Sequence, residues 1–160
     1  KEYYCGVVSV DFSGGENLQL VPFTTEESSG RVPLLEVEAR KSDTNPSETL
    51  NLRIRSDIAY LGRYAVLAAA EVKNYEAQGK GDKEIISDVG TDLNIQEIEQ
   101  VNTAEGYDIE VEFLYPGMEY VCIVAVRSLE DVEVYKRVTV RMDDWPSEAR
   151  VDDLLFLSGL

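Results

Sequence analysis

The stretch LYPGMEYVCIVAV, residues 114–126, decides the fold expected for this chain of 160 residues. Its second half, residues 120–126, is rich in valine and other apolar residues, a composition typical of a β-strand. Its first half contains Pro116 followed by Gly117. Proline presets a negative φ and glycine tolerates a positive φ, so this pair predicts a tight turn directly before the strand.

Alternating apolar and polar residues predict further strands on both sides of this one. The clearest examples are LNLRIRS (50–56) and YDIEVEF (107–113). In the second run we expect Tyr107, Ile109, Val111 and Phe113 to share one face. LLEVEAR (34–40), RYAVLAAA (63–70) and VEVYKRVTVRM (132–142) are also predicted strands. Short strands joined by polar turns favour an all-β sandwich over a parallel α/β fold.

One segment departs from this strand pattern. After residue 70 the sequence drifts toward helix, and at about residues 84–101 we expect a short helical insert in the sandwich. Asn94 followed by Glu97 is a capping-box pattern at a helix start. Ile95, Ile98 and Val101 are then expected on one face of this helix.

The charge balance and the missing histidine narrow the function classes. The chain has 15 Lys and Arg against 31 Asp and Glu, a formal net charge of −16. Such an excess repels phosphate backbones and anionic lipid headgroups, so we expect no nucleic-acid or membrane-surface binding. Without histidine, imidazole-dependent catalytic and zinc sites are excluded. No apolar run approaches about 18 residues, so we expect no membrane span.

The turn and strand of residues 114–126 resemble the Leu-x-Pro-Gly-x-x-Tyr signature of fibronectin type III domains. The matching residues are Leu114, Pro116, Gly117 and Tyr120. The resemblance implies an immunoglobulin-like or fibronectin-III-like β-sandwich, with these residues forming a structural turn and the tyrosine hydroxyl bonding upstream backbone. The tryptophan that the family usually carries on its second strand is missing from residues 50–56.

A closer resemblance is to tandem fibronectin-III-like modules of bacterial extracytoplasmic surface lipoproteins, carried by GTDLNIQEIEQVN (90–102) and the turn that follows. It spans about residues 33–142. It implies an extracytoplasmic location, at the cell surface or in the periplasm, and a lipid anchor on a segment ahead of Lys1. It also implies a non-catalytic structural or protein-interaction (spacer) role, with proteins or neighbouring domains of the same chain as partners. A carbohydrate-binding accessory module of a glycan-capture system, with polysaccharide as its partner, is the alternative.

The N-terminal segment repeats the strand pair that begins at Glu119. EYYCGVVSVDFSGGENLQLVPFTTEE (2–27) aligns without a gap on residues 119–144. We therefore interpret residues 1–27 as a β-hairpin equivalent to the last two strands of a preceding module. Residues 28–33 are then a linker, 34–142 the fibronectin-III-like domain, and 143–160 a linker with the start of a further segment. Convergence of two hairpins by composition is the alternative.

The repeat places Cys5 and Cys122 at equivalent positions, each two residues after a tyrosine. Immunoglobulin domains place a disulfide cysteine at this position, with its partner on the second strand, but residues 50–56 contain no cysteine. We therefore expect two free, buried thiols that pack as small apolar side chains.

Candidate chemistry is sparse. Exposed aromatic side chains are the residues most suited to stacking on sugar rings, namely Tyr60, Tyr75, Tyr115, Tyr135 and Trp145. The carboxylates of Asp82, Glu84, Asp88 and Asp92 suit calcium by chemistry, but their spacing fits no twelve-residue calcium loop, so a solvated acidic loop is expected. Paired carboxylates could hydrolyse glycosides, but among 31 acidic residues such a pair is uninformative. We expect no catalytic, cofactor or metal residues.

Overall fold

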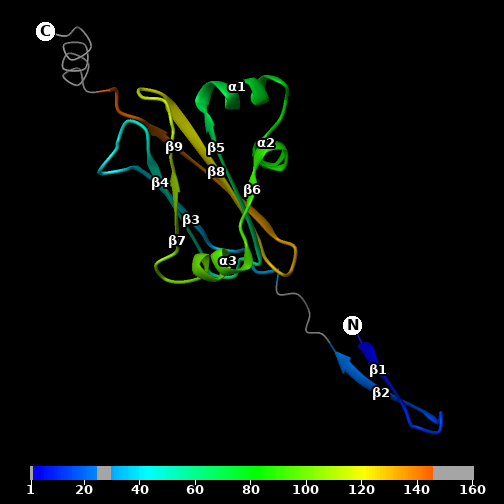
Figure 1. Cartoon of the computed structure of the whole chain (residues 1–160). Helices are drawn as coiled ribbons and strands as arrows, with labels where there is room; N and C mark the ends of the chain where they lie inside the picture. Colours follow the sequence, from blue (N-terminus) through cyan, green and yellow to red (C-terminus); the bar gives the residue numbers. More distant parts are fainter. Residues whose placement is uncertain (1, 25–29, 146–160) are drawn as a thin grey trace, which may run out of the picture. The chain divides into compact units, whose positions relative to one another are not determined.

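The computed structural model of the chain describes residues 2–24 and 30–145 (Figure 1). Two compact units make up the chain, Lys1–Arg31 and Val32–Leu160, here termed the hairpin unit and the main unit. Within the described residues, strands predominate and every strand pair is antiparallel. The described residues are therefore mostly β, which is compatible with the expected all-β class.

The hairpin unit consists of two nine-residue strands, β1 (Glu2–Val10) and β2 (Glu16–Thr24). The turn between them is closed by Asp11, whose Oδ1 accepts hydrogen bonds from the backbone N–H groups of Ser13 and Gly15. An aspartate that bonds the backbone ahead of it is a common way to set a turn. All side chains described in this unit are exposed, including its valines, leucines and aromatic residues.

The described part of the main unit contains two sheets and three helices (Figure 1). One sheet has the strand order β3-β4-β7, formed by Leu35–Lys41, Leu50–Ser56 and Tyr107–Val111. The other has the order β6-β5-β8-β9, formed by Thr91–Asp92, Leu61–Ala68, Glu119–Arg127 and Glu133–Arg141. The helices are α1 (Ala69–Ala77), α2 (Asp82–Val89) and α3 (Ile95–Val101).

The first core lies between the two sheets. The three-stranded sheet contributes Leu50, Leu52 and Ile54 of β4, and the four-stranded sheet contributes Cys122 and Val124 of β8, all fully buried. Helix α3 closes this core with its own buried residues, Ile98 and Val101. Apolar and polar residues alternate in β4 because every second residue of this strand faces the opposite sheet.

A second core covers the other face of the four-stranded sheet. Here α1 and α2 place Val72, Ile85 and Ile86 against Val121 and Ile123 of β8. Strand β8 is therefore buried on both faces, which explains why residues 120–126 are apolar without interruption instead of alternating. The helical segment thus begins at Ala69 and is longer than the predicted 84–101, within which α2 and α3 mostly fall.

The capping box at Asn94 is confirmed, but one residue of the predicted helix face is not buried. The Asn94 side chain accepts from the Glu97 N–H, and the Glu97 carboxylate accepts from the Asn94 N–H. Ile98 and Val101 are buried as predicted, whereas Ile95 is 74% exposed. As the first helical residue, Ile95 lies at the end of α3 and outside the core that the helix closes.

Phe113 also departs from prediction. Strand β7 ends at Val111, and Phe113 has a φ of 62° and a side chain that is 90% exposed. The alternation of the sequence continues through Phe113, but the backbone turns out of the sheet there. The next residue, Leu114, instead donates its N–H to the carbonyl of Glu48 in the β3–β4 loop.

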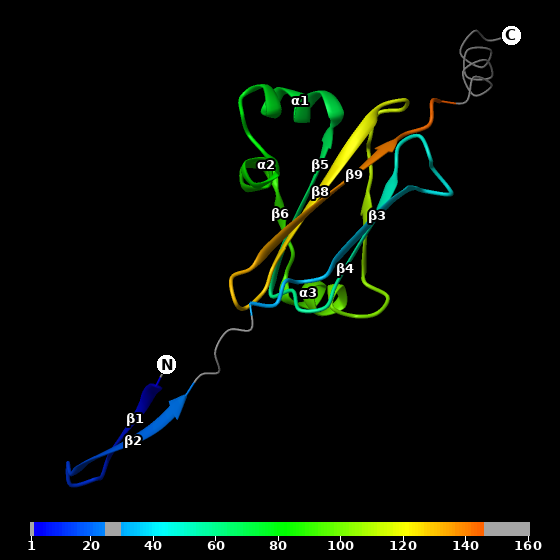
Figure 2. The same ribbon diagram turned by 180° about the vertical axis from the view of Figure 1, so that it is seen from behind.

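Strands β3 and β9 lie side by side, in different sheets, and run in the same direction (Figure 2). The Lys136 Nζ, near the start of β9, donates to the carbonyl of Leu35 at the start of β3 (3.5 Å). At the other end, Lys41 pairs with Asp143 just beyond β9. The chain therefore enters the two-sheet body at one end through β3 and leaves it at the opposite end through β9.

Candidate functional site

One groove in the described part of the main unit lies on the helix-covered face of the four-stranded sheet. Its volume is about 640 Å³, and its lining includes residues of α2 and of the end of β8. Its apolar floor includes Ile86 and Ala125. Polar side chains from four elements also line the groove. They are Arg63 of β5, Lys83 of α2, Asp92 of β6, and Glu133 and Tyr135 of β9. Arg127 adds a third cation at the end of β8.

The charges around this groove are compensated in pairs. Arg63 and Asp92 are opposite each other on β5 and β6, with Nε and Oδ1 2.5 Å apart. The Arg63 N–H is not aligned for a hydrogen bond, so this contact is an ion pair only. The Arg127 guanidinium pairs with Asp131 at 3.1 Å. Such partly exposed pairs stabilise a fold by at most about 1 kcal/mol each.

Tyr135 is held in its neutral form. Its hydroxyl donates to Glu133 Oε2 at 2.8 Å, and Lys83 Nζ lies 4.0 Å from the same oxygen. Burial, followed by the bond to the Glu133 carboxylate, raises the pKa of Tyr135 to about 12. At neutral pH this phenol is therefore a hydrogen-bond donor and cannot act as a base.

The four acidic residues considered for calcium each have a partner of their own. Asp82 pairs with Arg137, Asp88 with Lys80 and Asp92 with Arg63, while Glu84 accepts the N–H of Gly81 at the start of α2. Across the described ranges, no group of three or more His, Cys, Asp or Glu side chains is placed to hold a metal ion.

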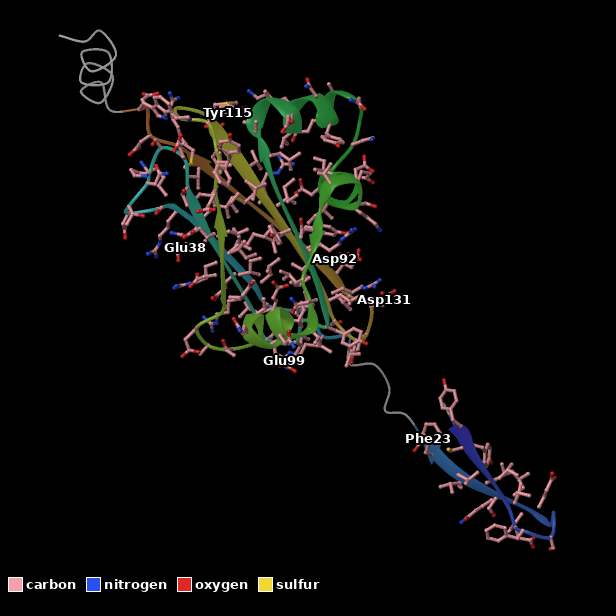
Figure 3. All side chains as sticks on the ribbon, in the orientation of Figure 1. Phe23, Glu38, Asp92, Glu99, Tyr115 and Asp131 are labelled. Atoms are coloured by element: carbon pink, nitrogen blue, oxygen red, sulfur yellow. The ribbon has the colours of Figure 1, made fainter. Side chains whose placement is uncertain are left out.

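The aromatic residues proposed as a ligand platform lie apart from one another. Tyr135 lines the groove, and Tyr75 of α1 is half-buried against the second core, with Lys80 Nζ 5.2 Å from its ring centre. Tyr60 is bonded through its N–H to Arg127 at the end of β8, whereas Tyr115 precedes the start of β8. Trp145 is exposed beyond the end of β9. Figure 3 shows Tyr115 far from Asp131, which follows β8.

The stacked ring pair in the described residues was not among these candidates. Tyr3 and Phe23 of the hairpin unit have ring centroids 5.7 Å apart and an interplanar angle of 22°. They are opposite each other in the β1–β2 register. The sequence does contain a signal for this pair, because the register of a hairpin can be counted outward from its turn.

The turn before β8 is built from the residues that carry the family resemblance. Met118 donates its N–H to the carbonyl of Tyr115, and Gly117 has a φ of 70°, a combination typical of a type II turn with proline in its second position. The Tyr120 hydroxyl accepts the N–H of Tyr115 at 2.9 Å. Leu114 packs against the first core. These contacts fix the turn against the sheet.

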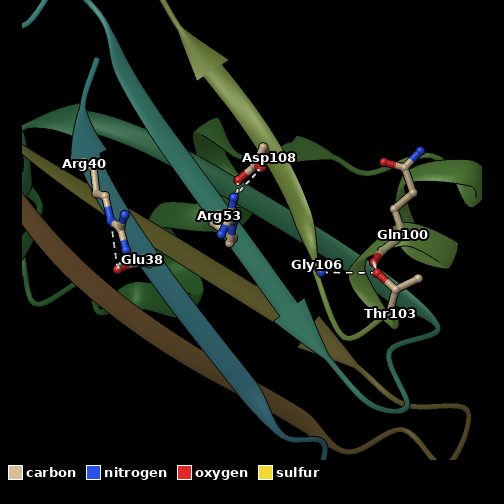
Figure 4. A network of polar contacts seen from close by, with 7 residues as sticks. All are labelled: Glu38, Arg40, Arg53, Gln100, Thr103, Gly106 and Asp108. Carbon is tan, nitrogen blue, oxygen red and sulfur yellow. Dashed lines mark hydrogen bonds and ion pairs between the residues drawn. The ribbon is translucent and has the colours of Figure 1, made fainter. Parts of the chain in front are cut away.

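The outer face of the three-stranded sheet is polar and largely exposed. Figure 4 shows polar contacts on this sheet. Arg53 of β4 makes two bonds to the carboxylate of Asp108 on β7, at 2.7 and 2.8 Å. The Arg53 guanidinium lowers the pKa of Asp108. Glu38 and Arg40 of β3 form a further pair. Nearby, Thr103 links α3 to β7 by donating to the Gln100 carbonyl and accepting the Gly106 N–H.

The two thiols are both free but differ in burial. Cys122 is 0% exposed in the first core, and burial raises its pKa to about 12. Cys5 is exposed, so the prediction of two buried thiols is wrong for this residue. The reason is local: the β1–β2 hairpin lacks the layers that cover β8 on both faces.

Comparison with models of protein families, with curated proteins and with solved structures found no match to this chain. In the described residues, no helix is both long and apolar enough to cross a membrane.

Proposed function

We propose that the main unit is a non-catalytic fibronectin-III-like sandwich module that acts as a spacer or protein-interaction module of an extracytoplasmic surface protein. Two antiparallel sheets with a core between them support the sandwich assignment, since this layering is shared by immunoglobulin-like domains. The hydroxyl of Tyr120, bonded to backbone upstream of its strand, supports the narrower family assignment.

The direction of β3 and β9 carries the spacer role. Because the chain enters at one end of the sheets and leaves at the other, successive modules can follow one another in a line. A seven-residue strand such as β3 spans about 20 Å, so each module would add at least this length. Its partners would be neighbouring domains of the same chain, at the cell surface or in the periplasm, with a lipid anchor on a preceding segment.

The chemistry of the groove supports a structural role over a catalytic one. Its cations lie beside carboxylates, and its tyrosine is neutral and hydrogen-bonded. A catalytic centre would instead be expected to hold groups whose pKa values are tuned toward neutral pH.

The spacer role can be tested on cells that display a surface protein containing this chain. We expect deletion of residues 34–142 to reduce antibody access to a tag placed at the distal end of the protein. Replacing these residues by an unrelated fibronectin type III domain should restore access, because a spacer contributes length. If the replacement domain does not restore antibody access, so that replacement and deletion reduce access equally, the module contributes more than length and the spacer proposal is wrong.

The groove favours a second candidate, a carbohydrate-binding module. Ligand sites commonly combine an apolar floor with a few polar groups and an aromatic ring, and the groove offers Ile86, Arg63 and Tyr135 in these roles. Titration calorimetry against a panel of polysaccharides tests this candidate. Binding that is lost in Tyr135→Ala and retained in Tyr115→Ala would favour it. Absence of heat across the panel would leave the spacer role as the better proposal.

A further inference from the structure

The hairpin unit and the β8–β9 pair have the same strand lengths and the same turn length. Tyr3 and Tyr120 are separated by 117 positions (120 minus 3), and the same offset converts the bounds of β1 into those of β8 and the bounds of β2 into those of β9. The turns between the strands therefore also have equal length. This agreement extends the sequence repeat to secondary structure.

The cross-strand register is identical as well. Glu2 is opposite Thr24 in the hairpin unit, and the equivalent residues Glu119 and Arg141 are opposite each other in the main unit. At the turn end, Val10 is opposite Glu16 as Arg127 is opposite Glu133. Because a slip of one residue would turn every side chain to the other face, equal register means that equivalent residues face equivalent sides.

The contacts of β8 therefore indicate which covering layers and which pairing strand are missing around β1. In β8, the face of Tyr120 and Val124 packs on the opposite sheet, the face of Val121 packs under the helices, and the second edge pairs with β5. In β1, the equivalents of these residues are Tyr3, Val7 and Tyr4.

The side chains of Tyr3, Tyr4 and Val7 in β1 are all exposed. Tyr4 is 63% exposed and Val7 56%, and β1 has β2 as its sole partner in the described sheets. A two-stranded hairpin with uncovered apolar faces is only marginally stable in water, and its free edge is open to pairing.

We propose that the hairpin unit is the terminal hairpin of a second domain with the plan of the main unit, whose other strands lie in the same polypeptide ahead of Lys1. This inference rests on the proposed function, because it makes the chain part of a tandem array. The edge of β1 opposite β2 then accepts an antiparallel strand equivalent to β5. In the main unit β5 ends 51 positions before β8 begins (119 minus 68). The pairing strand is therefore expected about 50 residues ahead of β1.

The register also predicts which residues meet. Cys122 of β8 is opposite Val66 of β5, so Cys5 should lie opposite the residue equivalent to Val66 and become buried. Cys5 thus serves as a probe of the missing strand, and Cys122 serves as the matched control in the same molecule.

The test compares the natural polypeptide that includes residues ahead of Lys1 with the 160-residue chain alone. In the 160-residue chain, we expect Cys5 to react with a thiol reagent at the rate of an unfolded peptide and Cys122 to be protected. In the longer polypeptide, Cys5 should be slowed by about 100-fold or more, as expected for a thiol exposed only by unfolding. An unchanged rate for Cys5 in the longer polypeptide would overturn the proposal, as would a natural start of the polypeptide at Lys1.

A matched pair of substitutions gives a second, independent result. Val7→Asp and Val124→Asp place a carboxylate at equivalent positions of β1 and β8. In the 160-residue chain, Val124→Asp should abolish the unfolding transition of the main unit while Val7→Asp leaves it unchanged. In the longer polypeptide, Val7→Asp should remove a second transition and restore the reactivity of Cys5. If Val7→Asp instead has no effect there, the hairpin belongs to no such domain.

A second copy of the chain is the competing occupant. In that case Cys5 would become protected in the 160-residue chain itself at high concentration, together with a dimer in sedimentation, and the proposal would be wrong. None of these outcomes depends on the length-replacement test of residues 34–142, so failure of this inference is distinguishable from failure of the spacer role.

Discussion

Cys122 illustrates how completely one side chain depends on its place in a strand. Its thiol is 0% exposed and packs in the first core, whereas the thiol of Cys5, at the equivalent position of β1, is exposed. Replacing Cys122 by serine puts an unpaired hydroxyl among apolar side chains. We expect Cys122→Ser to lower the free energy of unfolding by about 1–3 kcal/mol. Urea unfolding measures this loss, and Cys5→Ser should change the midpoint by less than the experimental error.

The same thiol makes the main unit sensitive to alkaline pH. Burial raises the pKa of Cys122 from 9.0 to about 12, so between these values the folded state holds a proton that the unfolded state has lost. The stabilisation is complete below about pH 9 and declines as the pH rises toward 12. Thermal melting from pH 8 to pH 11 should therefore show a falling Tm. Tm should fall less steeply with pH in Cys122→Ala. An equal slope in the two proteins would contradict a raised pKa at Cys122.

Phe113 holds a backbone conformation that suits its side chain poorly. Its φ of 62° lies in the left-handed region. Its ring is 90% exposed, so removing the ring sacrifices little packing. Asparagine adopts this conformation more readily than phenylalanine. We expect Phe113→Asn to raise the free energy of unfolding by about 1 kcal/mol, measured by urea titration. Phe113→Ala keeps the penalty of a Cβ at positive φ and should show less gain, so equal gains would point to a different cause.

At the scale of elements, strands could be predicted because their side chains repeat every two residues. β4 alternates because one face is buried and the other is wet, and the sequence LNLRIRS shows this directly. In β8 the apolar run indicates a strand, but not which layers cover its two faces. Helices α1 and α2 were only partly foreseen, because their short length leaves few apolar positions to reveal a helical period.

The candidate groove was less predictable than the strands. Its charged residues come from β5, α2, β6 and the β8–β9 hairpin, and only folding brings them together. Tyr135 could be chosen from the sequence because of its residue type. The pairing of Arg63 with Asp92 could not be predicted, since nothing in the sequence indicates that the two-residue strand β6 pairs with β5.

Helix α2 should contribute to stability through the sheet face it covers. Ile85 is fully buried in the second core against β8, whereas Ile95 at the start of α3 is largely exposed. We expect Ile85→Ala to cost about 2–5 kcal/mol, because it deletes buried methyl groups and leaves a cavity. The matched change Ile95→Ala should cost less than about 0.5 kcal/mol. Denaturant unfolding of the two variants distinguishes them, and similar losses would mean that α2 does not cover the sheet.

At the scale of the whole molecule, the two units should unfold independently. The hairpin unit and the main unit are each a compact unit, and both cores lie within the main unit. We therefore expect a chain of residues 32–145 to keep the Tm of the 160-residue chain within about 2 °C. Calorimetry provides the measurement. A large drop in Tm would show that the hairpin stabilises the main unit.

The shared direction of β3 and β9 has a mechanical consequence. A force that pulls on the two ends of the main unit acts along β3 and β9, so it loads their hydrogen bonds to β4 and β8 in shear, many at once. In the hairpin unit, Glu2 is opposite Thr24, so a force on its two ends opens the bonds one after another, like a zipper. Stretched as a single molecule, the main unit should therefore yield at a higher force than the hairpin. At forces between these two values, the hairpin is pulled open while the main unit, whose strands run from one end to the other, stays folded.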